Sequence, residues 1–488
     1  MANLLKDRRA GVLLHPTSLP GPGGQGDLGP NAFRFVDFLR DCGFSVWQTL
    51  PLGPTHSDRS PYQTLSVHAG NPELISRTDL VNRGWLDAAV QQDAAWLQHA
   101  YQGFLARADT GEQQAWRDFR SGHAAWLDDY ALFQAIRQSH SGNSWLDWPA
   151  RLRNRHKTGL DRFRNSNRDA IEQVCFEQFV FFTQWHELRE HARRQGVSLF
   201  GDIPIYVAHD SADVWSNRSL FSADKDGHLD VVAGVPPDFF SESGQRWGNP
   251  LYRWDRVAAA GFDWWIQRFR TQLELFDLVR LDHFRGFEKY WEIPADEETA
   301  VNGHWVDGPG AALFEKLIEV FVELPLVVED LGTITPEVEA LRQHFNFPGM
   351  KILQFAFDGN PENPYLPHNH EPISVVYTGT HDNDTTLGWY ASLDDHAKQA
   401  VLDYLGDSTD PMPWPVIRAA FDSVSCLAMV PLQDILTLDS AHRMNTPGTS
   451  QGNWQWRFAW DEVPAGLSGE LHELLQRYGR IIEMSLVE

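Results

Sequence analysis

The stretch 171–203, IEQVCFEQFVFFTQWHELREHARRQGVSLFGDI, passes from a helical pattern into a strand pattern. Four aromatic residues recur in it at helical spacing: Phe176, Phe179, Phe182 and Trp185. Gly196 then follows two arginines, which is typical of the end of a helix. The next residues, Val197–Ile203, form a nearly continuous apolar run of the kind found in strands buried on both faces. The stretch predicts one helix–strand unit of an α/β fold.

Seven further apolar runs have the same form, and most end in a polar or charged residue: Gly11–His15, Phe44–Pro51, Leu278–Asp282, Leu326–Asp330, Met350–Phe355, Ile373–Tyr377 and Leu427–Asp434. Helical patterns at 262–276 and 313–322 precede two of them. Eight buried strands alternating with helices predict an α/β fold of the (β/α)₈ (TIM) barrel type. An open doubly wound sheet is the alternative, but no G-x-G-x-x-G motif follows any of the runs.

The distances between the runs predict insertions. The second run begins near residue 44 and the third near residue 197, a gap far longer than an ordinary connecting loop. We therefore expect the barrel to be formed by residues 1–55 and 196–488, with a largely helical inserted subdomain at 56–195. The stretch 206–260 is rich in Gly, Pro, Asp and aromatic residues, which predicts a loop insertion rather than a domain.

Composition narrows the function. The 488 residues carry a formal charge of −25, which argues against nucleic acid as a partner, because binding to phosphates needs clustered Lys and Arg. No run of about 18 apolar residues, no signal-peptide pattern and no C-x-x-C pair occurs. We therefore expect a cytoplasmic protein without a membrane span. We also expect no cofactor and no metal ion, because no corresponding motif is present.

In a barrel, catalytic side chains come from the C-terminal ends of the strands. The polar residues there are His15, Asp202, Arg280, Asp282, His283, Glu329, Asp330, His381, Asp382 and Asp434. Arg280 and Asp282 point to the same side of a strand, and the arginine is expected to lower the pKa of the carboxyl, as an anionic nucleophile or stabiliser requires. Glu329 ends an apolar run, where desolvation is expected to raise its pKa and to favour a general acid.

Such a pair of carboxyls fits glycoside cleavage. A helix cap or a structural ion pair remains the ordinary alternative for any one of these carboxylates. Most of the 20 tryptophans fit core positions. Trp247, Trp454 and Trp456 are instead predicted to lie in loops, where flat rings can pack on sugars, and this also favours a carbohydrate ligand. The histidines could instead indicate a metal-dependent barrel hydrolase, although neither H-x-H nor H-E-x-x-H spacing is present.

Seven longer motifs carry a resemblance to a known family: SPYQTLSVHAGNP (60–72), GDIPIYV (201–207), GVPPDFFSESGQRWGNPLY (234–252), VRLDHFRGF (279–287), VEDLGTITPEV (328–338), TGTHDNDT (378–385) and RMNTPGTSQGNWQWR (443–457). Together they resemble the 4-α-glucanotransferases (amylomaltases, or disproportionating enzymes) of the glycoside hydrolase 77 type. They extend over essentially the whole chain. Two residues depart from the family's pattern, His68 and Glu73, which stand where apolar residues are expected and bear on packing or outer sugar contacts.

The resemblance implies a retaining transfer between α-1,4-glucans, which serve as donor and acceptor. It implies that Asp282 is the nucleophile, Glu329 the general acid/base and Asp382 a transition-state stabiliser, with the first two carboxyls about 5–5.5 Å apart. The donor-site ligands that it implies are Arg280, His381 and Asp202, and the rim contacts are Tyr62, Trp247 and Asn445. A retaining α-glucan hydrolase of amylase type and a non-catalytic glycan-binding protein are the alternatives. Donor length and oligomeric state stay open.

Overall fold

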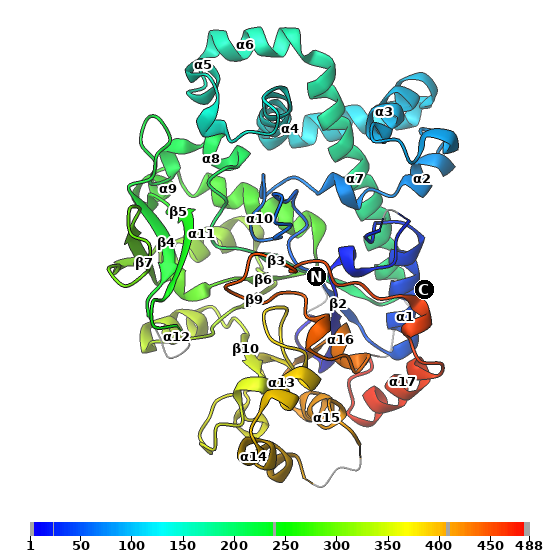
Figure 1. The fold of residues 1–488 in the computed structure, drawn as a ribbon, viewed down its shortest axis with the longest axis vertical. Helices are drawn as coiled ribbons and strands as arrows, with labels where there is room; N and C mark the ends of the chain where they lie inside the picture. Colours follow the sequence, from blue (N-terminus) through cyan, green and yellow to red (C-terminus); the bar gives the residue numbers. More distant parts are fainter. Residues whose placement is uncertain (1–3, 23, 238–240, 407–409, 483–488) are drawn as a thin grey trace.

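A closed barrel of parallel strands forms the centre of the protein (Figure 1). The computed structural model describes residues 4–22, 24–237, 241–406 and 410–482. The barrel strands are β1 (Arg9–Leu13), β2 (Val46–Gln48), β3 (Ser198–Ile203), β6 (Leu278–Leu281), β9 (Leu326–Val328), β10 (Gly349–Ile352), β11 (Ser374–Tyr377) and β12 (Leu427–Pro431). Their spatial order is β10-β11-β12-β1-β2-β3-β6-β9. The Val328 N–H donates to the Pro348 carbonyl at 2.9 Å and joins the two edges. The predicted barrel and its eight strands are confirmed.

The barrel interior is filled by side chains from its own strands. Val46, Phe200, Leu278 and Met429 belong to one buried cluster inside it. Gly11 leaves them the necessary room, because a Cβ there would lie 2.7 Å from both the Met429 sulfur and the Val46 Cβ. The continuous apolar runs of the sequence are therefore explained by burial on both faces of the sheet.

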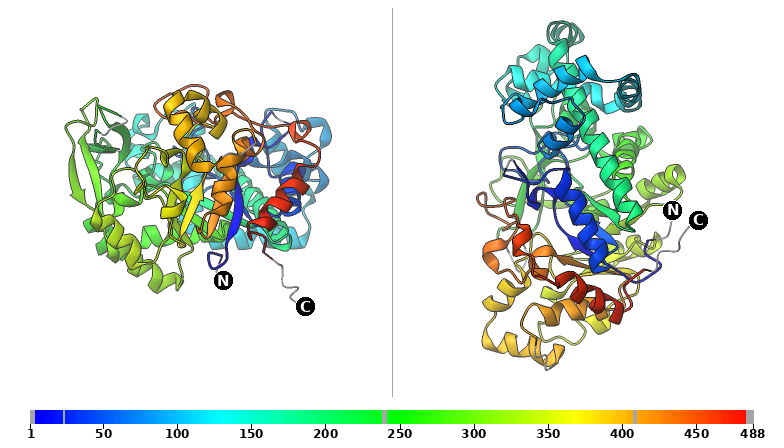
Figure 2. Two further views of the ribbon diagram at one scale, coloured as in Figure 1. Left: turned by 90° about the horizontal axis from the view of Figure 1, so that it is seen from below. Right: turned by 90° about the vertical axis from the view of Figure 1, so that its right-hand side faces the viewer.

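Helices surround the barrel, as the views of Figure 2 show. They include α1 (Pro30–Cys42), α10 (Asp263–Leu275), α11 (Ala311–Phe321), α12 (Pro336–His344), α15 (Trp414–Asp422) and α17 (Leu467–Arg477). Three further helices, α13 (Thr386–Ser392), α14 (Asp395–Leu405) and α16 (Leu432–Ile435), follow the last two strands in the chain. The apolar faces of these helices pack on the sheet and enclose its outer surface.

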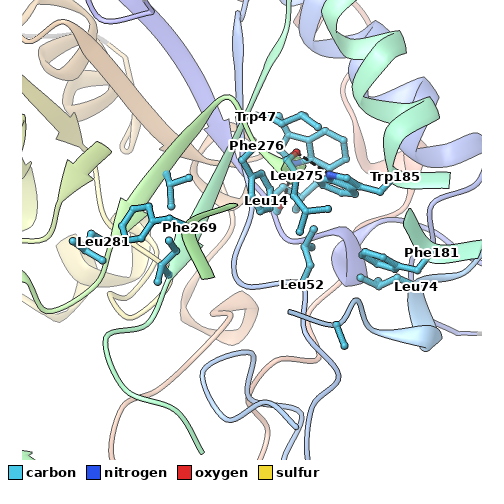
Figure 3. Close-up of a cluster of buried hydrophobic side chains, with 14 of the residues drawn as sticks. Leu14, Trp47, Leu52, Leu74, Phe181, Trp185, Phe269, Leu275, Phe276 and Leu281 are labelled. Carbon is cyan, nitrogen blue, oxygen red and sulfur yellow. Dashed lines mark hydrogen bonds between the residues drawn. The ribbon is translucent and has the colours of Figure 1, made fainter. Parts of the chain in front are cut away.

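The chain between β2 and β3 is largely helical and extends away from the barrel at the top of Figure 1. It contains α2 (Arg77–Asn82), α3 (Trp96–Arg107), α4 (Thr110–Ser139), α5 (Ala150–Arg153), α6 (Lys157–Ser166) and α7 (Arg168–Arg194). Helix α7 returns the chain to the barrel, where the Trp185 indole N–H donates to the Leu275 carbonyl at 2.9 Å. Figure 3 shows this bond within the surrounding cluster of buried side chains. The predicted helix–strand unit is therefore the link between the helical region and the barrel.

The prediction of a loop at 206–260 is wrong. This stretch contains α8 (Ala212–Ser216), β4 (Val231–Val235), β5 (Gln245–Pro250) and α9 (Trp254–Ala259). The strands join β7 (Lys289–Pro294) and β8 (His304–Asp307) in an antiparallel sheet of order β5-β4-β7-β8. Strand β4 pairs on one side with the nearby β5 and on the other with residues far along the chain, such as Gly234 with Trp291, and no local pattern reveals this second partner.

In the four described segments of the chain, we find no helix with the length and apolar character needed to cross a membrane.

Candidate active site

An open groove lies at the C-terminal ends of the barrel strands, with a cavity volume of about 640 Å³. Six of the nine predicted site residues line it: Tyr62, Trp247, Arg280, Asp282, Glu329 and Asp382. The other three, Asp202, His381 and Asn445, each bind one of these six side chains. The structure thus brings all nine predicted residues together at one end of the barrel, from strands and loops that are far apart in the sequence.

Arg280 holds two carboxylates in place. Its Nη1 donates to Asp202 Oδ2 at 2.7 Å, and its Nη2 lies 2.8 Å from Asp282 Oδ1. The Tyr62 hydroxyl donates to the same Asp202 oxygen at 2.6 Å. Burial alone would lower the pKa of Arg280, but the charges of Asp202 and Asp282 raise it well above its ordinary value. Arg280 is therefore a fixed cation beneath the groove.

The Asp282 carboxyl has a pKa raised to about 6, because its burial outweighs the opposing effect of Arg280. The expectation of a lowered pKa is thus wrong in its net direction. Arg280 acts as expected, but the charges of Asp202 and Asp382 add to the desolvation. The backbone of Asp282 is fixed by a hydrogen bond from its N–H to the Ile203 carbonyl at 3.0 Å. At neutral pH this carboxyl is largely ionised and partly exposed to the groove.

The Glu329 carboxyl is the most strongly perturbed acid of the groove. Its burial, together with the nearby negative charge of Asp282, raises its pKa to about 8. Its Oε2 accepts a hydrogen bond from the His283 N–H at 2.5 Å, and its own N–H donates to the Leu281 carbonyl at 3.0 Å. The raised pKa expected from the apolar run before Glu329 is confirmed. This carboxyl therefore holds its proton near neutral pH, as a general acid must.

Asp382 has the opposite electrostatic character. Burial alone would raise the pKa of Asp382, but His381 and the hydrogen bond from Asn445 hold this pKa well below its usual range. The Asn445 side-chain amide donates to Oδ1 at 2.6 Å, and His381 Nε2 lies 3.2 Å from Oδ2. The His381 ring is stacked on Tyr62, with ring centroids 5.2 Å apart. Asp382 is therefore an anion throughout the neutral range, whereas Glu329 keeps its proton there.

Trp247 lines the groove, but the expectation that it lies in a loop is wrong. It lies in β5, and its ring meets that of His283 edge to face at 4.8 Å. Trp454 packs beside Tyr62 and His381, and Trp456 lines a smaller neighbouring cavity, so their contact with sugar stays a prediction. In the described part of their loop, Pro447 rather than either ring lines the groove.

Two of the other strand-end candidates, Asp330 and Asp434, are structural. Asp330 Oδ1 accepts from the Met350 N–H at 2.7 Å, and Asp434 Oδ2 accepts from the hydroxyls of Thr378 and Thr386, each at 2.6 Å. His15 is buried in the smaller cavity, where burial lowers its pKa to about 3.

The two residues that depart from the family's pattern lie outside the groove. His68 is buried, with its Nδ1 2.8 Å from the Thr271 hydroxyl and its ring stacked on Trp126. Glu73 lies in a short 3₁₀ helix and binds the Gln25 side chain. His68 therefore serves local packing, whereas Glu73 is exposed.

Several residues that line the groove were not predicted: Tyr206, Gln245, Arg285, Trp305, Leu331, Thr333 and Phe355. Arg285 could have been found, because it lies three residues after Asp282 in the motif VRLDHFRGF. Trp305 carries no local signal, because it reaches the groove only through the pairing of β8 with β7.

Comparisons with known proteins agree with this geometry. The 4-alpha-glucanotransferase family matches residues 14–462. A 4-alpha-glucanotransferase of Thermus thermophilus is 49% identical over 95% of this chain and 96% of its own length. One from Synechocystis is 46% identical over 98% of this chain and 99% of its own length. An amylomaltase from Streptococcus agalactiae, solved in complex with acarbose, superposes with a TM-score of 0.94 at 35% identity, covering 97% of this chain and all of that one. The chain belongs to the 4-alpha-glucanotransferase family.

Proposed function

We propose that this protein transfers a segment of an α-1,4-glucan to the 4-hydroxyl of an acceptor glucose or maltodextrin, by a retaining double displacement. The observation that carries the proposal is the set of three carboxyls in one groove. The pKa of Glu329 is raised to about 8, that of Asp282 to about 6, and that of Asp382 is lowered. One protonated acid beside one ionised carboxylate is what retaining glycoside cleavage needs.

The first step forms a covalent intermediate. A carboxylate oxygen of Asp282 attacks the anomeric carbon of the donor, and an ester bond to that carbon forms as the glycosidic C–O bond breaks. Glu329 transfers its proton to the departing oxygen, so that the shortened glucan leaves as a neutral alcohol. Arg280 keeps Asp282 ionised and oriented for the attack.

The second step transfers the glucan. The Glu329 carboxylate takes the proton of the acceptor's 4-hydroxyl, whose oxygen attacks the anomeric carbon while the ester to Asp282 breaks. Two inversions give net retention, and both carboxyls return to their starting states. No metal ion or cofactor takes part in either step.

The remaining residues are proposed to bind the sugar at the cleavage point. Asp382, kept ionised by Asn445 and His381, accepts hydrogen bonds from donor hydroxyls, and these bonds strengthen as positive charge develops on the ring. Asp202, Arg280 and His381 are the other donor-site ligands. Tyr62, Trp247 and Asn445 contact the sugar at the rim.

Transfer requires that an acceptor sugar outcompete water for the intermediate. We assign this to the segment around Trp247 in β5, whose ring lines the groove beside His283. Trp247→Ala is expected to increase free glucose relative to longer oligomers made from maltotriose. Trp126→Ala, in helix α4 outside the groove, is the control and should leave the product ratio unchanged. An unchanged ratio in Trp247→Ala would remove Trp247 from this role.

Incubation with maltotriose tests the function as a whole. Transfer gives a ladder of oligomers longer than maltotriose, whereas a retaining hydrolase of amylase type gives only shorter products. No turnover, with glucan binding that is unaffected by Asp282→Asn, would indicate a binding protein. Loss of activity with a chelator would indicate a metal-dependent hydrolase.

A cytoplasmic location is also part of the proposal. It is supported by Cys42, Cys175 and Cys426, which are all buried free thiols, as is usual in a reducing compartment. Fractionation of the source cells tests it, and recovery of the protein from an extracytoplasmic fraction would contradict it.

A further inference from the structure

Trp305 lines the groove but has no part in the steps above. It lies in β8, at the outer side of the antiparallel sheet, and its side chain is partly exposed. Residues Leu331 to Thr333, which come shortly after Glu329 in the chain, line the same groove. A partly exposed indole in a groove has a large apolar surface available for a ligand.

Arg285 fixes the position of this ring. Its guanidinium carbon lies 3.8 Å from the centroid of the Trp305 ring, and its Nη1 donates to the Thr333 carbonyl. Arg285 is itself buried, with 6% of its surface exposed. The edge-to-face contact with Trp291, at 5.0 Å, holds the ring from within the sheet. Trp305 is therefore a rigid part of the groove wall, attached to the loop that carries Glu329.

The location of Trp305 defines which sugar it faces. Asp382 and His381, which lie 3.2 Å apart, form one side of the reaction centre and are assigned to the donor ring. Glu329 protonates the bond on the other side, so its loop borders the leaving sugar and later the acceptor. Because Arg285 joins Trp305 to that loop through Thr333, Trp305 lies on the acceptor side.

We propose that Trp305, held by Arg285, is a packing platform for the sugar ring of the acceptor and of the leaving glucan. The proposal rests on the proposed function. The apolar face of a glucose ring packs on the free part of the indole, and the fixed ring positions the 4-hydroxyl near Glu329. The indole thereby favours a sugar over water as the second nucleophile.

α-Maltosyl fluoride as donor separates the two halves of the reaction. Its C–F bond breaks as the ester to Asp282 forms, and fluoride leaves without occupying a sugar site. Maltose, added at increasing concentration, then serves as acceptor. For Trp305→Ala we expect the acceptor KM to rise about tenfold, because one aromatic contact with the sugar is lost. The ratio of hydrolysis to transfer should rise as well. The effect on fluoride release should be much smaller, because that step uses no acceptor site.

Two further substitutions at this position distinguish a flat platform from a structural role. Trp305→Phe keeps a ring and is expected to retain an acceptor KM within about threefold of the parent, whereas Trp305→Leu keeps apolar volume without the ring and should resemble Trp305→Ala. They also decide the matter if Trp305→Ala does not fold. Arg285→Lys keeps the charge but loses the planar contact, and should raise the acceptor KM as well. His304→Ala, on the neighbouring exposed position of β8, is the matched control and should resemble the parent.

The proposal is overturned if the acceptor KM of the alanine and leucine variants stays within twofold of the parent, or if fluoride release falls as much as acceptor use. Failure of the proposed function would look different. In that case the parent itself would give no products longer than the donor at any maltose concentration.

Discussion

Replacement of Glu329 by glutamine is expected to stabilise the protein, and increasingly so as the pH rises from 5 to 8. The pKa of Glu329 is raised to about 8 in the folded protein, whereas a glutamate in an unfolded chain has a pKa of about 4.3. Between these values the unfolded chain releases the proton that the folded protein keeps. The free energy of unfolding of the parent therefore falls as the pH rises through this window, and it becomes constant above pH 8. The variant has no carboxyl at this position and lacks this loss.

The size of the effect follows from the same values. Each pH unit within the window is worth about 1.4 kcal/mol, so three units give about 4 kcal/mol at most. Partial exposure of Glu329 to the groove and its coupling to Asp282 reduce this to about 2–3 kcal/mol. With an unfolding entropy of about 2 cal/mol/K per residue, the 488-residue chain has a total of about 1 kcal/mol/K. The difference in Tm between Glu329→Gln and the parent should therefore grow by about 2–3 °C between pH 5 and pH 8.

Thermal unfolding of parent and variant at pH 5, 6, 7 and 8, in one buffer at constant ionic strength, measures this difference. Glu298→Gln changes an exposed glutamate in the same way and serves as the control, whose Tm difference from the parent should not vary with pH. A Tm difference for Glu329→Gln that is constant over this range, or that shrinks with rising pH, would refute the raised pKa and with it the electrostatic basis for the general acid.

Three other outcomes follow from the structure. The pH profile of kcat/KM should be bell-shaped, with its acid limb at about 6 from Asp282 and its alkaline limb at about 8 from Glu329; a profile with no alkaline limb below pH 9 would contradict this. Asn445→Ala removes a hydrogen-bond donor from Asp382 and should lower kcat on maltotriose about tenfold, with a smaller effect on KM. Gly11→Ala forces a methyl group against Met429 and Val46 and should lower the Tm by about 1–3 °C, and an unchanged Tm would show that the barrel interior has room to relax.

The sequence alone was sufficient to predict the barrel because its signals are local. Each barrel strand is buried on both faces, so nearly every one of its positions must be apolar, and the strand is visible in the sequence as a short apolar run. The meeting of Arg280 with Asp282 was likewise predictable, since alternate residues of a strand share a side. Local patterns also sufficed for the raised pKa of Glu329, which ends such a run.

The features that were missed depend on contacts between distant segments. Strand β4 lies between β5 and the distant β7, and Trp305 reaches the groove because β8 pairs with β7 in the same sheet. The pKa of Asp282 depends on how deeply the folded chain encloses it and on Asp202, from β3, and Asp382, from the loop after β11. Trp454 lies in a loop, as its surroundings predict, but it packs beside Tyr62 rather than on the groove surface.

Trapping of the glycosyl-enzyme intermediate tests the central claim most directly. Glu329→Gln lacks the base of the second step, so that α-maltosyl fluoride should form the ester with Asp282 but transfer it slowly. Mass spectrometry of the digested protein should then find one maltosyl unit on the peptide that contains Asp282, and none in Asp282→Asn. A maltosyl unit on another carboxyl, or no covalent adduct while fluoride is still released, would contradict the assignment of Asp282 as the nucleophile of a retaining transfer.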